Sequence, residues 1–127
     1  MIAVDTSALI AIVLFEPAAQ SCKNALQSDP NVLISAGTLT ETLIVASRRN
    51  LSEQALRLVD ELNFDVIPVT VETARRIEQA YSRWGKGVHR AALNLGDCFA
   101  YNVAKQHDCA LLYVGDDFSR TDVKSVL

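Results

Sequence analysis

Short apolar runs alternate with longer segments of helical periodicity along the whole chain. The runs predict strands at residues 2–5, 32–36, 65–69 and 110–114, with a short strand near the C-terminus as an open alternative. Between them apolar residues recur every three or four positions, which predicts helices at residues 6–14, 17–28, 38–49, 52–63, 71–84 and 96–107. Strands separated by helices favour an α/β fold, a three-layer α/β/α sandwich around a mostly parallel sheet of four to five strands.

Acidic residues stand where apolar runs give way to helix starts. They are Asp5, Glu41, Asp97 and the adjacent Asp116 and Asp117. Right-handed crossovers would bring the carboxyl ends of parallel strands to one edge of the sheet, where such sheets bind ligands. Two carboxylates about 5 Å apart repel by roughly 3 kcal/mol at an effective dielectric constant near 20. A cation among them would remove this repulsion, and oxygen-only ligands select Mg²⁺ or Mn²⁺.

Each acid also has a purely structural interpretation. Thr38 and Glu41 have the spacing of a capping box, in which the glutamate only bonds back to the helix start. Asp5 and Asp97 could each cap the helix that follows, and the pair Asp116–Asp117 could be turn residues. One at a time, these interpretations are as good as a metal site or better; the shared sheet edge is what favours the metal.

Composition narrows the class of protein. The 127 residues carry 12 basic and 15 acidic side chains, a net charge of −3, and half are hydrophobic, as in an ordinary globular domain. No apolar run approaches the roughly 20 residues of a membrane span, and the first residues lack a basic n-region. We therefore expect a cytoplasmic protein without a membrane partner. The three cysteines and two histidines show no spacing typical of zinc sites or disulfides.

Several segments share their residues with a known family. They are Asp5–Leu9, Tyr81–Gly87, Ala91–Tyr101 and Gly115–Asp122, together with Glu41 after the second strand. These segments resemble the PIN-domain ribonucleases, and more closely the VapC toxins of type II toxin–antitoxin systems. The resemblance covers residues 1 to about 123 and implies a single PIN domain over residues 1–127. It also implies a metal-dependent endoribonuclease that cleaves RNA phosphodiester bonds.

The resemblance assigns roles to the acids. Asp5, Glu41 and Asp97 match the acidic positions of the family, and either Asp116 or Asp117 is the fourth. Asp5 and Asp97 would hold the main Mg²⁺ or Mn²⁺ ion, with the others acting directly or through water. One or two ions are implied.

Other residues would support this site. Thr6 or Ser7 matches a small hydroxyl residue that would orient the first carboxylate or bond a metal-bound water. The candidates for holding the RNA backbone are Arg83, Lys86, His89 and Arg90. A solvated surface is an equal alternative for these basic residues. Trp84, beside them, could stack on a base, although packing against the core is favoured.

The resemblance also implies partners. A cognate VapB antitoxin would inhibit the protein by laying its C-terminal tail across a groove between the N-terminal helices, with a basic side chain reaching the carboxylates. The apolar residues Leu9, Ile10, Val13 and Leu14 could form that groove, and core packing explains most of them equally well. A homodimer and a toxin–antitoxin hetero-oligomer are expected as well.

Two alternatives remain, a non-catalytic binding module and a phosphohydrolase or receiver domain that also gathers aspartates at strand ends. A non-catalytic PIN-like module that binds RNA or protein would lack one of the acids, whereas Asp5, Glu41 and Asp97 are all present. A metal-dependent phosphohydrolase would carry a second aspartate two residues after Asp5, where Ser7 stands instead. A receiver domain would have a lysine after a late strand, and the segment Gly115–Asp117 has none.

Overall fold

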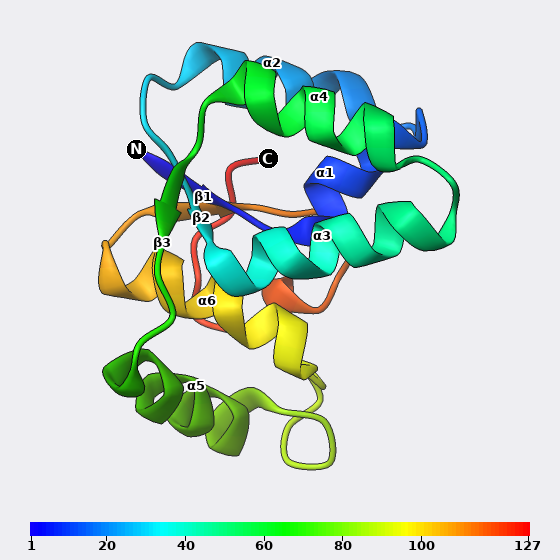
Figure 1. Cartoon of the computed structure of the whole chain (residues 1–127). Helices are drawn as coiled ribbons and strands as arrows, with labels where there is room; N and C mark the ends of the chain where they lie inside the picture. The colour runs from blue at the N-terminus through cyan, green and yellow to red at the C-terminus, as the bar shows by residue number, and fades with distance from the viewer.

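The computed structural model describes all 127 residues and places a four-stranded parallel sheet between helical layers (Figure 1). The strands, in the spatial order β3-β2-β1-β4, are β1 (Ile2–Val4), β2 (Val32–Ser35), β3 (Asp65–Ile67) and β4 (Ala110–Leu112). The helices are α1 (Thr6–Val13), α2 (Ala19–Ser28), α3 (Ala36–Arg48), α4 (Ser52–Leu62), α5 (Val71–Trp84), α6 (Leu95–Gln106) and the short 3₁₀ helix η1 (Phe118–Arg120). The predicted sandwich is confirmed.

Alternate residues of the strands supply two separate cores, because successive side chains of a strand point to opposite faces. Ala3, Leu33 and Leu111 pack under α5 and α6. Val4 and Ile34 belong to the cluster that packs under α1 and α2. Figure 1 shows these two pairs of helices on opposite sides of the sheet. The strands are short and buried on both faces, as parallel strands usually are.

The C-terminal segment covers the free edge of β4. The backbone N–H of Leu111 donates to the carbonyl of Lys124 at 2.8 Å, and that of Val126 donates to the carbonyl of Leu111 at 3.1 Å. Leu111 and Ser125 form a single isolated parallel bridge. The fifth strand that the sequence left open is thus reduced to one bridge, and the sheet keeps four strands.

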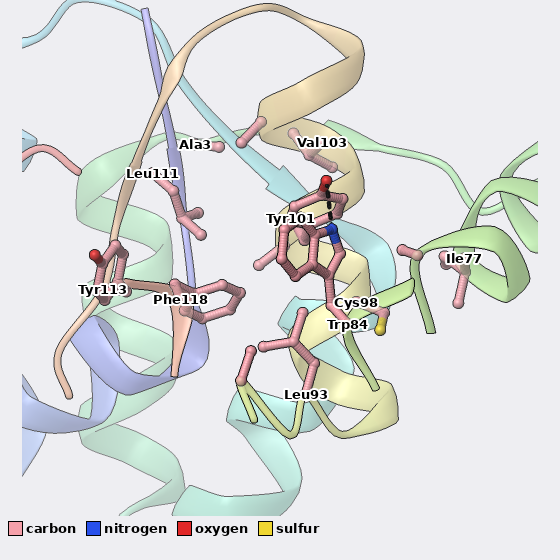
Figure 2. Close-up of a cluster of buried hydrophobic side chains, with 14 of the residues drawn as sticks. Ala3, Ile77, Trp84, Leu93, Cys98, Tyr101, Val103, Leu111, Tyr113 and Phe118 are labelled. Carbon is pink, nitrogen blue, oxygen red and sulfur yellow. Dashed lines mark hydrogen bonds between the residues drawn. The ribbon is translucent and has the colours of Figure 1, made fainter. Parts of the chain in front are cut away.

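The segment after α5 forms a loop with a closed base. The backbone N–H of Lys86 donates to Leu93 at 2.9 Å, and that of Leu93 donates to Trp84 at 3.1 Å. Trp84 is buried and packs in the α5–α6 core, where its Nε1–H donates to the Tyr101 hydroxyl at 2.9 Å (Figure 2). The core-packing interpretation of Trp84 is therefore confirmed. None of the helices is both long and apolar enough to span a bilayer.

Candidate active site

Asp5 stands at the carboxyl end of the central strand β1 and caps α1. Its Oδ2 accepts hydrogen bonds from the backbone N–H of Ser7 at 3.0 Å and from the Ser7 hydroxyl at 2.7 Å. The side chain is 3% exposed, and its Oδ1 is buried without any hydrogen-bond partner. Burial raises the pKa of Asp5 to about 7, although the two hydrogen bonds from Ser7 lower it. The negative charges of Asp97 and Glu41 raise it further.

The two candidate hydroxyls have different partners. Besides its bond to Asp5, the Ser7 hydroxyl accepts the backbone N–H of Val114 at 3.0 Å, which ties the end of β1 to the segment after β4. The Thr6 hydroxyl instead donates to the carbonyl of Thr38 in α3 at 3.3 Å. Ser7 is therefore the residue that orients the Asp5 carboxylate, whereas Thr6 connects α1 to α3.

Glu41 lies inside α3. The helix is capped by Ser35, whose hydroxyl accepts the N–H of Gly37 at 3.1 Å, so the predicted capping box of Thr38 and Glu41 is wrong. Thr38 is fully buried within the helix. The Glu41 carboxylate packs against Gly96, where an added Cβ would overlap its oxygens. Glu41 therefore has no capping role and faces the start of α6.

Asp97 stands at the start of α6, where it has a capping role other than the one predicted. The N-cap is Asn94, whose Oδ1 accepts the N–H of Asp97 at 2.8 Å, while Oδ2 of Asp97 accepts the N–H of Asn94 at 3.0 Å. Asp97 is thus the third helical residue of a capping box and not the cap itself. Burial raises the pKa of Asp97 to about 6 despite the Asn94 bond, with repulsion from Asp117 and Glu41 in support.

Electrostatics distinguish Asp117 from Asp116 as the candidate for the fourth acid. Asp117 is the member whose negative charge raises the pKa of Asp97. It immediately precedes η1, in which Phe118 is buried against the core. Both aspartates are exposed, and both carbonyls accept hydrogen bonds in the turn, that of Asp116 from the N–H of Ser119 at 3.2 Å and that of Asp117 from the N–H of Arg120 at 3.4 Å. The negative charge of Asp117 thus acts on Asp97, which favours Asp117 as the fourth acid, and the choice between the two aspartates stays a prediction.

The donor set suits a hard cation. The charges of Asp97 and Glu41 raise the pKa of Asp5, those of Asp117 and Glu41 raise the pKa of Asp97, and all of the donor atoms of these side chains are oxygens. As oriented here, no three of these side chains stand close enough together to hold an ion. The unpartnered Oδ1 of Asp5 is the atom that the chain itself leaves unsatisfied. A bound cation would satisfy it.

Comparisons with known proteins show the family of this chain. The family model described as PIN domain matches residues 2–124. The chain is 41% identical, over 95% of its length and of theirs, to ribonuclease VapC42 of Mycobacterium tuberculosis strain H37Rv. It is 39% identical to ribonuclease VapC of Mycolicibacterium smegmatis over 97% of this chain and 98% of that one. The chain belongs to the VapC ribonuclease family of PIN-domain proteins.

Solved structures share the fold of this VapC-family chain. The crystal structure of Mycobacterium tuberculosis VapC20, titled a sarcin–ricin loop cleaving toxin, superposes with a TM-score of 0.81 at 20% identity, covering 99% of this chain and 98% of that one. A toxin–antitoxin complex from Klebsiella pneumoniae gives a TM-score of 0.70 at 22% identity, over 96% and 93% of the two chains.

Two of the four basic candidates in this VapC-family protein are engaged with Trp84. The guanidinium of Arg83 lies over the Trp84 ring at 4.5 Å and pairs with Asp122 at 3.7 Å. The His89 ring meets Trp84 edge-on at 4.8 Å, and its Nδ1 accepts the N–H of Ala91 at 3.0 Å. These contacts give Arg83 and His89 a structural role in shaping the loop.

The other two basic candidates are free in the loop. Lys86 and Arg90 are exposed, and neither side chain forms an ion pair. The carbonyl of Arg90 accepts a hydrogen bond from Arg120 at 3.5 Å, which connects the loop to η1 beside Asp117. Lys86 and Arg90 are thus the side chains available to a polyanion.

Sequence reasoning missed two residues that support the acids, Asn94 and Gly96. The spacing of Asn94 and Asp97 is that of a capping box with asparagine as the cap, so this signal was present in the sequence. The contact between Gly96 and Glu41 depends on how α3 packs against α6. No local pattern could have revealed it.

Proposed function

We propose that this protein is the toxin of a type II toxin–antitoxin system and a metal-dependent endoribonuclease that cleaves RNA phosphodiester bonds. The observation that carries the proposal is the buried carboxylate of Asp5, whose Oδ1 has no hydrogen-bond partner and whose pKa is raised by burial and by the charges of Asp97 and Glu41. The relatives named ribonucleases, about 40% identical over nearly their whole length, support it.

Asp5 and Asp97 would hold Mg²⁺ or Mn²⁺, as one or two ions, with Glu41 and Asp117 acting directly or through water. Asp116 is the weaker candidate for the fourth position. A divalent cation bound there supplies the charge that activates water for attack on phosphorus and neutralises the phosphate. No histidine or lysine is placed among these acids as an alternative general base.

The residues of the chain orient these acids. Ser7 holds Oδ2 of Asp5 through two hydrogen bonds, so Oδ1 is presented in one direction. The backbone N–H of Asn94 holds Oδ2 of Asp97 through a single hydrogen bond. Asp5 and Asp97 also stand at the N-terminal ends of α1 and α6, where the helix dipole favours their charged forms. The fold thus moderates the repulsion within the acidic cluster without removing it.

Lys86 and Arg90 would hold the RNA backbone beside the acids, while Arg83 and His89 maintain the loop that carries them. If so, replacing both Lys86 and Arg90 with glutamine should weaken RNA binding and flatten its dependence on salt concentration. Binding that keeps its full salt dependence would remove these two residues from the interface.

A VapB-type antitoxin would inhibit this centre by bringing a basic side chain to the carboxylates in place of the metal. Leu9 and Val13 are buried in the cores and cannot contact a partner. Ile10 and Leu14 are partly exposed and remain available for such a groove. The homodimer and the toxin–antitoxin hetero-oligomer belong to the same proposal.

The proposal is tested by inducing the wild type and an Asp5→Asn variant in bacterial cells and sequencing the 5′ ends of cellular RNA. We expect new RNA ends with the wild type, none with Asp5→Asn, and wild-type ends with Asp60→Asn, a matched control on the exposed face of α4. Identical new ends from wild type and Asp5→Asn would refute the assignment. Hydrolysis of small phosphomonoesters by the purified protein would favour a phosphohydrolase.

A further inference from the structure

A second polar pocket lies between α5 and α6, toward the end of α6 that is remote from the acids. Its volume is about 240 Å³, and its polar lining consists of Arg76, Gln79, Arg83, Asn102, Lys105 and Gln106. Asn102 and Lys105 follow Asp97 on the same helix by five and eight residues, which places them roughly 8 and 12 Å further along its axis. The pocket and the acidic cluster are thus separate but share one helix.

The pocket carries an excess of positive charge. Arg83 and Lys105 share a single counter-ion, Asp122, at 3.7 and 3.3 Å from its Oδ2. Arg76 forms no ion pair, and its Nε is buried without an acceptor in the chain. Three cations therefore face one carboxylate, which leaves two positive charges uncompensated.

Arg76 is the residue that indicates a ligand. Its Nε–H is buried and has no acceptor in the chain, whereas the large majority of buried polar groups are paired. Asn102, which is 7% exposed, lines the same pocket, and its amide keeps contact with solvent. An anion in the pocket would supply the acceptor that the Nε–H of Arg76 lacks.

We propose that this pocket binds a backbone phosphate of the RNA strand, away from the bond that is cut. A phosphate presents oxygens in several directions, which suits two guanidinium groups, an ammonium and an amide arranged around a cavity. An RNA strand that crosses the exposed Arg83 and the loop with Lys86 and Arg90 would reach both the acidic cluster and this pocket. The assignment to RNA rests on the proposed nuclease function, whereas the binding of phosphate does not.

The phosphate site is tested first with inorganic phosphate. In ¹⁵N-labelled wild-type protein, the side-chain amide resonances of Asn102 should shift and saturate as phosphate is added. Arg76→Gln should weaken this response at least about fivefold; Arg76 has no ion pair, so the fold should tolerate the change. Arg75→Gln, the matched control on the neighbouring residue outside the pocket, should leave the response unchanged. Asn102 resonances that do not respond to phosphate or RNA would overturn the proposal.

The RNA assignment is tested with a single-stranded octanucleotide in EDTA, where no cleavage competes with binding. Arg76→Gln should weaken binding about fivefold and lower the slope of log affinity against log salt by about 0.7, the value for one lost phosphate contact on a single strand. Asn102→Asp, nearly isosteric but negatively charged, should weaken it at least as much. Arg75→Gln should keep a slope close to that of the wild type, because it removes only a charge that lies outside the pocket.

The outcomes separate the two proposals. RNA affinity and salt slope unchanged in Arg76→Gln would overturn the RNA assignment, even if phosphate alone shifts Asn102. A response of Asn102 to an oligoglutamate peptide but not to RNA would also contradict it and indicate an acidic protein partner. Failure of the wild type to cleave RNA in Mn²⁺ would instead count against the nuclease proposal, since the phosphate measurement does not depend on cleavage.

Discussion

At the residue scale, Asp5 places a carboxylate where burial favours a neutral group. A free aspartate has a pKa near 3.9, and burial together with the neighbouring acids raises the pKa of Asp5 to about 7. Above that pH the metal-free protein keeps a negative charge in a site that destabilises it. A residue held at such a disadvantage is typical of a functional site.

Asp5→Asn should therefore stabilise the metal-free protein while abolishing cleavage. The amide oxygen can still accept the Ser7 bonds, and the buried charge disappears, so the free energy of unfolding at pH 8 should rise by about 1–3 kcal/mol. Urea denaturation in EDTA measures this change, with Asp60→Asn as the control. A variant less stable than the wild type under these conditions would show that Asp5 mainly serves the fold.

Asp117 and Asp116 should differ in their effect on cleavage. Because the charge of Asp117, and not that of Asp116, acts on Asp97, Asp117→Asn should lower the cleavage rate at least about tenfold, and Asp116→Asn less than about threefold. The rates are compared under single-turnover conditions at saturating Mn²⁺. The reverse order would make Asp116 the fourth acid.

At the element scale, η1 is held against α6 by a chain of side chains. Trp84 donates to the Tyr101 hydroxyl, and Tyr101 donates to Asp122 at 2.7 Å, two residues beyond the end of η1. Burial and the bond to Asp122 raise the pKa of Tyr101 to about 12, so the hydroxyl remains a donor. This chain fixes the segment that begins with Asp117.

Asp122→Ala should loosen η1, whereas Asp122→Asn should have a smaller effect. The ion pairs of Asp122 are partly exposed and contribute little, but alanine leaves the Tyr101 hydroxyl without its acceptor, which costs about 1–3 kcal/mol. Unfolding in urea gives the stability, and cleavage should fall in Asp122→Ala because Asp117 is displaced. Equal stability of the two variants would exclude the hydrogen bond as the main contribution.

The elements themselves could be predicted because their signal is local. Periodicity located every strand and every α-helix with no end displaced by more than two residues, whereas the 3₁₀ helix η1 was not predicted. Caps were less predictable, since Ser35 and Thr38 are both good cap residues and only the position of β2 decides between them. The choice between Asp116 and Asp117 likewise depends on where Phe118 enters the core.

At the scale of the whole molecule, topology explains why the acids meet. All four strands are parallel, so their carboxyl ends share one edge, and this much followed from the alternation of strands and helices. The pocket between α5 and α6 could not be predicted, because it depends on how the two helices pack. Its residues come from two separate stretches of the sequence, 76–84 and 101–106, and carry no recognisable motif.

The stability of the metal-free protein should fall as pH rises from 5 to 7 and then level off. With raised pKa values of about 7 for Asp5 and about 6 for Asp97, the folded state binds more protons than the unfolded state in this window, so the slope is negative. Mn²⁺ binds the deprotonated acids and should stabilise the protein increasingly toward pH 8. Urea unfolding at several pH values, with EDTA or Mn²⁺, measures both slopes; a metal-free stability that rises over this range would contradict the raised pKa values.

The central claim is that the acids at the carboxyl edge form a metal-dependent RNA-cleaving centre. Its most direct test is single-turnover cleavage of RNA by the purified wild type and Asp5→Asn, each in Mn²⁺ and in EDTA. We predict cleavage by the wild type in Mn²⁺, none in EDTA, and a rate at least about a hundredfold lower for Asp5→Asn in Mn²⁺. Cleavage that persists in EDTA, or an undiminished rate for Asp5→Asn, would contradict this account.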